Sequence, residues 1–209
     1  PAARVYRDQP QAFFRTGIDE GDSLVALTAI RQVTCHGHAD RGSFVFEYGG
    51  ESLILDPGMI GYSDPASRQY QETFCHSTPT FSGRSQSAGT EEYDTRVLDF
   101  YSSSGDLCPG DSAGIDWAIF DIGAVYPEAR RLVRQLLFAR SRVVCLIDEV
   151  ETFAEEPFEL NFTCLGPIEI EAADGPSHLA RAVSDTGDNR LDLMTCATVP
   201  LADSTARWG

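Results

Sequence analysis

Two histidines in CHGHADRGSF, residues 35–44, have the type and spacing that metal binding or proton transfer requires. His36 and His38 stand one residue apart and lead into an apolar run, and the whole chain has only four histidines. In an extended strand, residues i and i+2 point to the same face. The two imidazoles would therefore project together, and they could share one metal ion or divide the work between a metal ion and a substrate.

A metal ion needs further ligands, and Asp56 and His76 are the candidates. Asp56 ends the second arm of a predicted hairpin, GSFVFEYGGESLILDPG (42–58), which folds back alongside the strand that follows His38. His76 lies in QETFCHSTP. Two imidazole nitrogens and a carboxylate oxygen suit zinc, with water or another group in the fourth position.

Simpler interpretations of these residues stay open. Two histidines at the start of a strand are often solvated or hydrogen-bonded in the core rather than ligands. Asp56 stands directly before Pro57-Gly58, which is typical of an aspartate that caps a turn.

The elements that would position these side chains are predicted mainly as short β-strands. The Gly49-Gly50 pair inside 42–58 predicts a tight hairpin turn. Many short strands separated by turn residues favour an all-β fold, and we predict an antiparallel β-sandwich. The other predicted strands cover 5–17 (with a turn at 8–10), 23–30, 95–103, 116–126, 142–153, 158–165 and 168–173.

One segment, PEARRLVRQLLFAR (127–140), has a helical pattern. Pro127 suits a first helical position, and the apolar residues Leu132, Val133, Leu136 and Leu137 fit a 3.6-residue period. A strand over RRLVRQLLFA remains the alternative. Segments 82–94 and 102–114 are predicted as loops.

The composition indicates a folded domain and excludes several partners. The 209 residues are predicted to form one domain, 1–209, and no run of eighteen apolar residues suggests a membrane span. The net charge of −16, with no lysine, repels nucleic acid and anionic membranes, although it also suits simple solubility. No signal-peptide pattern opens the chain, which begins at Pro1, and we expect a processed chain or a piece of a longer protein.

The six cysteines are not expected to form a disulfide framework, because their spacing is irregular and no CxxC pair occurs. Cys145 and Cys164 lie in apolar runs that are typical of ordinary buried thiols. Cys35 and Cys75 each precede a histidine, so they could pair if the fold brings those histidines together.

The central part of the chain, HGHADRGSFVFEYGGESLILDPGMIGYSDPASRQYQETFCHSTPTFSGRSQ, resembles the C-terminal β-sandwich domain of the heparinase II/III-like polysaccharide lyases, a family that includes heparin lyase II and the oligoalginate lyases. The shared features are H-x-H-x-D, a Ser-Phe strand, an apolar arm ending in Asp-Pro-Gly, a Tyr, an Arg, a His-containing segment and a Gly-x-x-Gln loop. FDIGAVYPEARRLVRQLLFARSRVVCLIDEVE adds a second similar segment. The resemblance covers roughly residues 1–165.

The resemblance implies a role for each matching residue. His38, Asp56 and His76 match zinc ligands, with one structural zinc per chain. His36 matches an active-site histidine, and Tyr62 matches a tyrosine that lines the catalytic cleft; without the resemblance, Tyr62 is equally an aromatic residue packed over the hairpin end. The implied partners are an acidic polysaccharide substrate and an upstream α/α toroid domain, with a homodimer as a further option, in the periplasm or outside the cell.

This sequence also departs from the family pattern. Ser77 replaces an Asn, Cys75 a small residue and Ser82 an Asp, which puts the choice of substrate in doubt more than the metal site. The helical toroid, which supplies further catalytic residues, is absent from this chain. Three explanations remain: the toroid was removed from this chain, it belongs to another chain, or this protein does not catalyse the reaction.

The implied reaction is β-elimination at a uronic acid, in which His36 and Tyr62 would act on the carboxylate, the C5 proton and the leaving oxygen. The alternative is a non-catalytic, zinc-stabilised sandwich that packs on a partner domain or binds a glycan. A cupin-type metalloenzyme is a weaker option, because Asp40 and Arg41 stand where its glutamate is expected.

Overall fold

A computed structural model describes residues 3–31, 37–87, 92–103, 114–140, 143–171, 177–183, 187 and 189–196. His36 lies outside these residues, as does most of the predicted 102–114 loop. None of the helices in the described ranges has the length and apolar character needed to cross a membrane.

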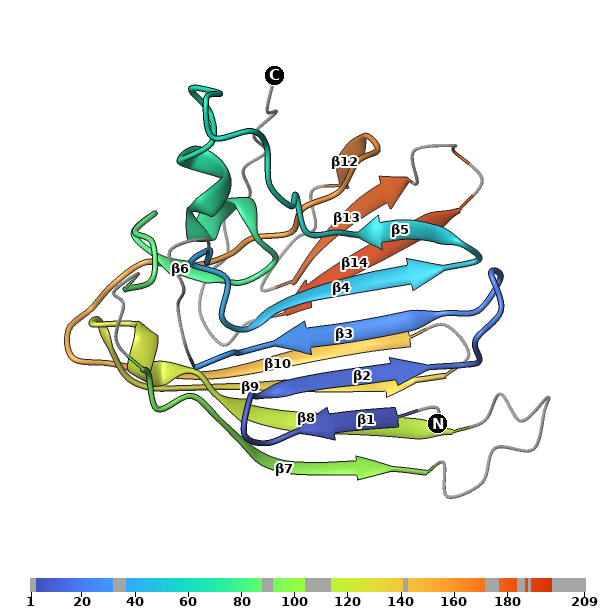
Figure 1. The fold of residues 1–209 in the computed structure, drawn as a ribbon, viewed down its shortest axis with the longest axis horizontal. Coiled ribbons are helices and arrows are strands. Elements are labelled where there is room, and N and C mark those ends of the chain that lie inside the picture. Colours follow the sequence, from blue (N-terminus) through green and yellow to red (C-terminus); the bar gives the residue numbers. More distant parts are fainter. Residues whose placement is uncertain are drawn as a thin grey trace.

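The first layer is a five-stranded antiparallel sheet in the order β1-β2-β3-β4-β5 (Figure 1). Buried and half-buried residues alternate along the middle strands, so one face lies in the core and the other faces outward. The strands are β1 (Ala3–Tyr6), β2 (Gln11–Arg15), β3 (Leu24–Thr28), β4 (Ser43–Tyr48) and β5 (Glu51–Ile54).

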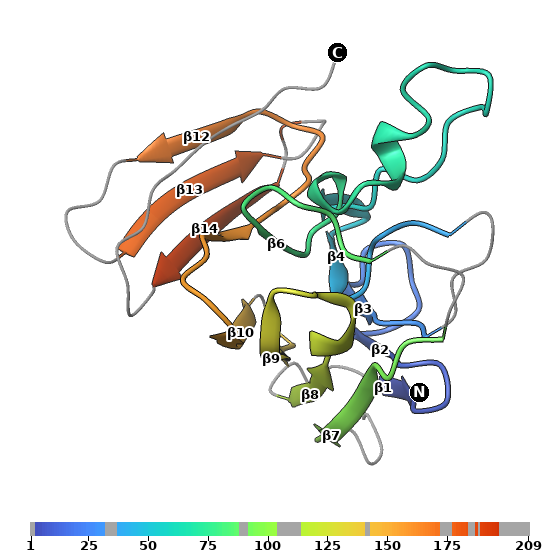
Figure 2. The ribbon, with the colours of Figure 1, turned by 90° about the vertical axis from the view of Figure 1, so that its left-hand side faces the viewer.

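The second layer is a four-stranded antiparallel sheet in the order β10-β9-β8-β7, which lies behind the first in Figure 1 and beside it in Figure 2. Its strands are β7 (Arg96–Ser102), β8 (Ile115–Asp121), β9 (Ala129–Ala139) and β10 (Val143–Thr152). The inner faces of the two sheets form one apolar core, in which the rings of Phe46 and Phe138 lie 6.5 Å apart across the layers. The predicted antiparallel β-sandwich is confirmed.

Smaller elements complete the fold. β6 (Pro79–Phe81) pairs with β11 (Phe158–Leu160), and a three-stranded sheet contains β12 (Ile168–Glu171), β13 (Ser177–Val183) and β14 (Arg190–Cys196). This last sheet stands to one side of the two main layers in Figure 2. Within the described ranges there are also three short 3-10 helices, η1 (Gln69–Gln71), η2 (Thr73–Cys75) and η3 (Gly123–Val125).

The predicted hairpin 42–58 forms as β4 and β5, with Gly49 and Gly50 at its turn. Both glycines have positive φ, 61° and 82°, a conformation that L side chains rarely adopt. The Gly-Gly pair therefore fixes the turn, and the turn sets which residues of β5 lie beside β4.

The helical interpretation of 127–140 is wrong, and the strand alternative is confirmed as β9. From Leu132 onward, every second side chain of β9 lies in the core: Leu132, Arg134, Leu136 and Phe138. Leu132 and Leu136 are four residues apart, a spacing that a helix and an alternating strand both satisfy. The alternation of apolar and polar residues that marks a strand is not visible in the sequence here, because the charged Arg134 occupies an inward-facing position.

Arg134 is 1% exposed and joins three segments of the chain. Its Nε and Nη2 donate to the two carboxylate oxygens of Asp148 on β10, each at 2.8 Å. Its Nη1 donates to the carbonyls of Gly42 at 2.7 Å and Ser77 at 3.2 Å. Burial alone would lower the pKa of Arg134, but Asp148 more than offsets it, and the pKa lies above the ordinary value. The guanidinium therefore stays charged and ties the four-stranded sheet to the segments after His38 and His76.

Replacing Arg134 by Met should lower the free energy of unfolding by about 3–5 kcal/mol, because the Asp148 carboxylate would be left buried and unpaired. Urea denaturation measures the loss. The matched control is Arg131→Met on the same strand, where an exposed arginine pairs with exposed Glu149 and little change is expected. Equal losses in the two variants would contradict the role given to Arg134.

Candidate metal centre

His38 lies in the segment that leads into β4, and Arg41 holds this segment in place. The Arg41 guanidinium donates from Nη1 to the His38 carbonyl at 3.0 Å and from Nε to the Ile30 carbonyl at 3.2 Å. The Ala39 N–H donates to the Gln71 carbonyl at 2.8 Å. The backbone that carries His38 is thus fixed from both sides.

A buried polar network fixes the same segment against the strand region after His76. The Gln86 side chain accepts from the Arg41 N–H at 2.9 Å and donates to the Arg41 carbonyl at 2.6 Å. Gln86 also donates to the Tyr126 hydroxyl, which donates to the Pro79 carbonyl at 2.8 Å. Thr78 Oγ1 donates to the Arg41 carbonyl at 2.7 Å. Burial raises the pKa of Tyr126 to about 12, so its hydroxyl stays a donor.

Asp56 lies two residues beyond β5, and its carboxylate makes two contacts. Oδ1 accepts the Gly58 N–H at 2.9 Å, which is the turn-capping role that the Asp-Pro-Gly sequence indicates. Oδ2 lies 2.7 Å from His76 Nδ1. One oxygen of the carboxylate therefore caps the turn, and the other contacts the His76 ring.

His76 follows η2 and is fully buried. Its backbone N–H donates to the Thr73 carbonyl at 3.0 Å, and its carbonyl accepts from the Thr78 N–H at 2.8 Å. The contact with Asp56 orients the ring, an arrangement that carboxylates commonly provide for histidine ligands.

These elements bring His38, Asp56 and His76 together. One possible ligand atom from each of the three lies within 4.8 Å of the others, and the two imidazole rings have centroids 5.1 Å apart. Two nitrogens and one carboxylate oxygen at this spacing could hold a metal ion.

Three buried side-chain atoms lack a hydrogen-bond partner within the described part of the chain: His38 Nε2, His76 Nε2 and Ser43 Oγ. Buried polar atoms are almost always paired, so each such atom requires an explanation. The two imidazole nitrogens belong to the predicted ligands. A metal ion fits this observation, because it accounts for unpaired lone pairs that no protein donor satisfies.

The charges of the centre suit cation binding. Burial, and next the proximity of His76, lower the pKa of His38, so its imidazole is neutral and carries a lone pair at neutral pH. Burial would raise the pKa of Asp56, but the hydrogen bond and charge of His76 and the Gly58 N–H lower it overall. Asp56 is therefore ionised, as a carboxylate ligand must be.

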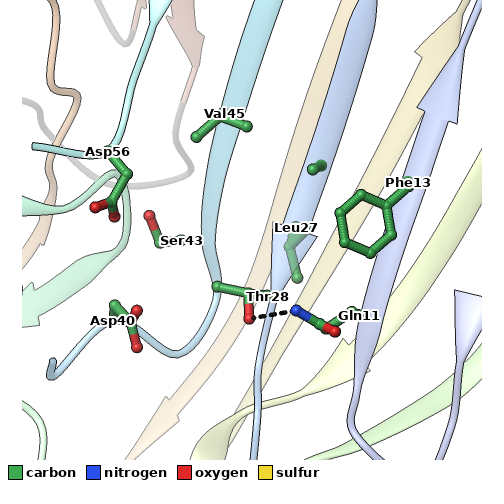
Figure 3. A pocket seen from close by; sticks show the side chains of 9 residues that line it. Gln11, Phe13, Leu27, Thr28, Asp40, Ser43, Val45 and Asp56 are labelled. Atoms are coloured by element: carbon green, nitrogen blue, oxygen red, sulfur yellow. Dashed lines mark hydrogen bonds between the residues drawn. The ribbon is translucent and has the colours of Figure 1, made fainter. Parts of the chain in front are cut away.

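Asp40 is a further acidic group beside the centre that the sequence analysis did not place there. It shares a hollow with Ser43 and Asp56, as Figure 3 shows. Burial raises its pKa, with Asp56 adding to the rise and His76, Arg41 and His38 opposing it. The sequence signal that could have found Asp40 is its position two residues after His38 in the H-x-H-x-D pattern.

Of the two remaining predicted site residues, Tyr62 is not part of this cluster. Tyr62 lies in the loop between β5 and η1, six residues beyond Asp56, and is 58% exposed. His36 falls outside the described residues, so its role stays a prediction.

Cys75, Cys145 and Cys164 are free thiols. Cys75 is buried next to His76 and has no bridge to another described residue, while Cys35, the partner that the sequence allowed, lies outside the described part of the chain. Cys145 and Cys164 are half-buried rather than fully buried. Burial raises the pKa of Cys75 and of Cys164 to about 11. Cys35 and Cys108 lie outside the described residues.

Several solved structures share this fold, among them the following three. Heparinase III matches with a TM-score of 0.65 and 12% identity, over 87% of this chain and 27% of its own. The heparan sulfate lyase HepC from Pedobacter heparinus matches with a TM-score of 0.65 and 18% identity, over 87% of this chain and 29% of its own. A further heparinase III matches with a TM-score of 0.66 and 15% identity, over 92% and 32%. This chain therefore spans less than a third of each of these proteins.

Comparison with curated proteins finds no match. The sequence model of the family described as heparinase II/III-like, C-terminal, matches residues 18–193, which extends the likeness beyond residue 165. This match covers most of the 209 residues, and the chain therefore belongs to the heparinase II/III-like family as a C-terminal domain of that family.

Proposed function

We propose that this chain is the C-terminal part of a polysaccharide lyase that cleaves uronic-acid-containing polysaccharides by β-elimination. The observation that carries the proposal is the pair of unpartnered imidazole nitrogens of His38 and His76 beside the ionised Asp56. Membership of the heparinase II/III-like family supports the reaction class.

Zinc is the ion that we propose for the centre. Two imidazoles and one carboxylate are a frequent zinc donor set, and the Asp56 contact to His76 provides the orientation that such ligands need. When bound, the ion supplies binding energy that holds the segments around His38, Asp56 and His76 in one arrangement.

The reaction breaks the C5–H bond and the bond between C4 and the glycosidic oxygen, and it leaves a C4–C5 double bond. A base takes the C5 proton, and the electron pair of that bond forms the double bond as the oxygen leaves. The leaving oxygen receives a proton. Because the C5 proton is weakly acidic, the uronate carboxylate must be neutralised by a nearby donor or cation.

His36 and Tyr62 are the residues that we propose for this chemistry. His36 would neutralise the carboxylate or assist as the base, depending on the epimer of the sugar. A phenol near positive charge can act as a base and then protonate the leaving oxygen, which suits Tyr62. His38 would fix the backbone two residues from His36, so that His36 is held ready for the substrate.

We further propose that an α/α toroid domain completes the catalytic cleft in a longer protein. This chain spans less than a third of the solved relatives, and its own charge is −16, which repels an acidic polymer at long range. Another domain would then supply the basic groups for most of the substrate. A periplasmic or secreted location fits such a substrate.

His38→Ala and His76→Ala should each weaken zinc binding at least ten- to a hundredfold, because each removes one ligand. Zinc titration and elemental analysis of the purified chain measure the effect, and the melting temperature should fall with the loss of bound metal. His178→Ala on β13 is the matched control and should retain the metal. Unchanged metal content in both ligand variants would refute the centre.

In a longer protein that contains the upstream domain, His36→Ala and Tyr62→Phe should abolish elimination while leaving metal content and melting temperature nearly unchanged. His38→Ala should lower both stability and activity. The ultraviolet absorbance of the new C4–C5 double bond measures the reaction on a panel of uronate polymers.

Two results would contradict these assignments. If His36→Ala releases the metal while His38→Ala keeps it, the two histidines have exchanged roles. If the longer protein eliminates no uronate polymer, the chain is a zinc-stabilised module that packs on a partner domain or binds a glycan.

A further inference from the structure

Two arginines stand without an acidic partner on the outer face of the five-stranded sheet. Arg4 on β1 pairs in register with Phe13 on β2, and Arg15 lies two residues beyond Phe13, so the three side chains share one face. Neither guanidinium has an ion pair or hydrogen bond with another described residue, although the chain carries twice as many acidic as basic residues, 32 against 16.

The arginines border a hollow with aromatic walls. Arg4, Tyr6, Phe13 and Arg15 line a depression of about 280 Å³. The rings of Tyr6 and Phe13 meet edge to face, with centroids 6.1 Å apart and planes at 83°, and Tyr6 is 51% exposed. Aromatic surface and two guanidinium groups therefore meet in one shallow site.

A second hollow continues from this site to the metal centre. It has a volume of about 260 Å³, shares Phe13 with the first, and extends to Asp40, Ser43 and Asp56. Figure 3 shows Phe13 and Gln11 on one side of it and the two carboxylates on the other. From β1 to β4 the groove crosses three inter-strand spacings, roughly 14 Å, which is the length of a short oligosaccharide.

The wall of this groove offers hydrogen bonds to a polar ligand. Gln11, Thr28 and Ser43 follow one another in register across β2, β3 and β4. Gln11 Nε2 makes only a long contact of 3.4 Å to Thr28 Oγ1. Ser43 Oγ is buried and has no partner among the described residues. A ligand hydroxyl could satisfy it, since buried hydroxyls are rarely left unpaired.

We propose that Arg4 and Arg15, with Tyr6 and Phe13, bind an acidic sugar residue of the substrate several units from the metal centre. Guanidinium groups match carboxylate and sulfate oxygens with paired, charge-assisted hydrogen bonds. The aromatic rings cover the apolar C–H face of a pyranose. The subsite rests on the proposed function for its substrate class, but its binding step requires neither the metal nor the elimination.

The groove is negatively charged at one end and positively charged at the other, so it can orient an acidic ligand. Asp40 and Asp56 lie at one end and the two arginines at the other, about the length of the oligosaccharide away. An acidic sugar is attracted to the arginine end, so this end would set the register in which the polymer reaches the centre.

The test is an NMR titration of the 209-residue chain with two acidic tetrasaccharides, one from alginate and one from heparan sulfate, and with neutral cellotetraose. The acidic probes should shift the β1 and β2 amide signals. The double variant Arg4→Gln/Arg15→Gln should bind them at least tenfold more weakly. Arg130→Gln, an exposed arginine on β9 of the other sheet, is the matched control and should bind as the wild type does. The alginate and heparan sulfate arms separate carboxylate from sulfate recognition.

Several outcomes would overturn the subsite: unchanged affinity in the double variant, equal loss in Arg130→Gln, or equally tight binding of cellotetraose. A wild-type dimer that the double variant dissociates in sedimentation would also overturn it, because a second copy would then cover the face. If the arginine-dependent binding is found but the longer protein shows no elimination, the subsite stands and the lyase proposal fails.

Discussion

The structure depends on one charge buried between its two sheets. A guanidinium inside a core is tolerated only when its hydrogen-bond donors find acceptors, and Arg134 finds them in Asp148 and in the carbonyls of Gly42 and Ser77. Those carbonyls follow His38 by four residues and His76 by one. Through Arg134, the four-stranded sheet sets the distance between the segment after His38 and the segment after His76. Neither segment belongs to that sheet. Gln86 and Tyr126 repeat this arrangement with neutral groups, so the centre rests on a stiff polar scaffold.

The strands that sequence patterns specify locally were predictable. Gly49 and Gly50 require a turn whose backbone only glycine adopts easily, and the hairpin 42–58 follows from it. The segment 127–140 was not predictable, because its apolar spacing fits two periods and the deciding residue, Arg134, faces inward. Only the tertiary contacts of Arg134 explain that orientation, and those with the Gly42 and Ser77 carbonyls come from residues more than fifty positions away.

The cluster of His38, Asp56 and His76 was predictable from the sequence, because the hairpin placed Asp56 near the strand that follows His38 and the family resemblance supported His76. The groove was not accessible, since it arises from the register of four strands, β1 to β4, rather than from any motif. Asp40 and Ser43 become candidate binding residues only because the fold places them in one hollow with Gln11, Thr28 and Asp56. Gly42 illustrates the same dependence: its φ is +84°, and an added Cβ would meet the Ile122 side chain at 2.5 Å. Gly42 thus allows the close approach of the two layers beside the centre.

The large sequence separation between Arg134 and the residues it contacts also affects when the centre can form during synthesis. All three proposed ligands are present once residue 76 has been made, but Arg134, which ties the Gly42 and Ser77 carbonyls to the four-stranded sheet, lies 92 residues beyond Gly42. Contacts between residues so far apart form late, because the intervening chain must first lose its conformational freedom. A nascent chain would therefore carry its proposed ligands unassembled until the β9–β10 hairpin has left the ribosome. Assembly of the centre would mark the completion of the sandwich rather than its beginning.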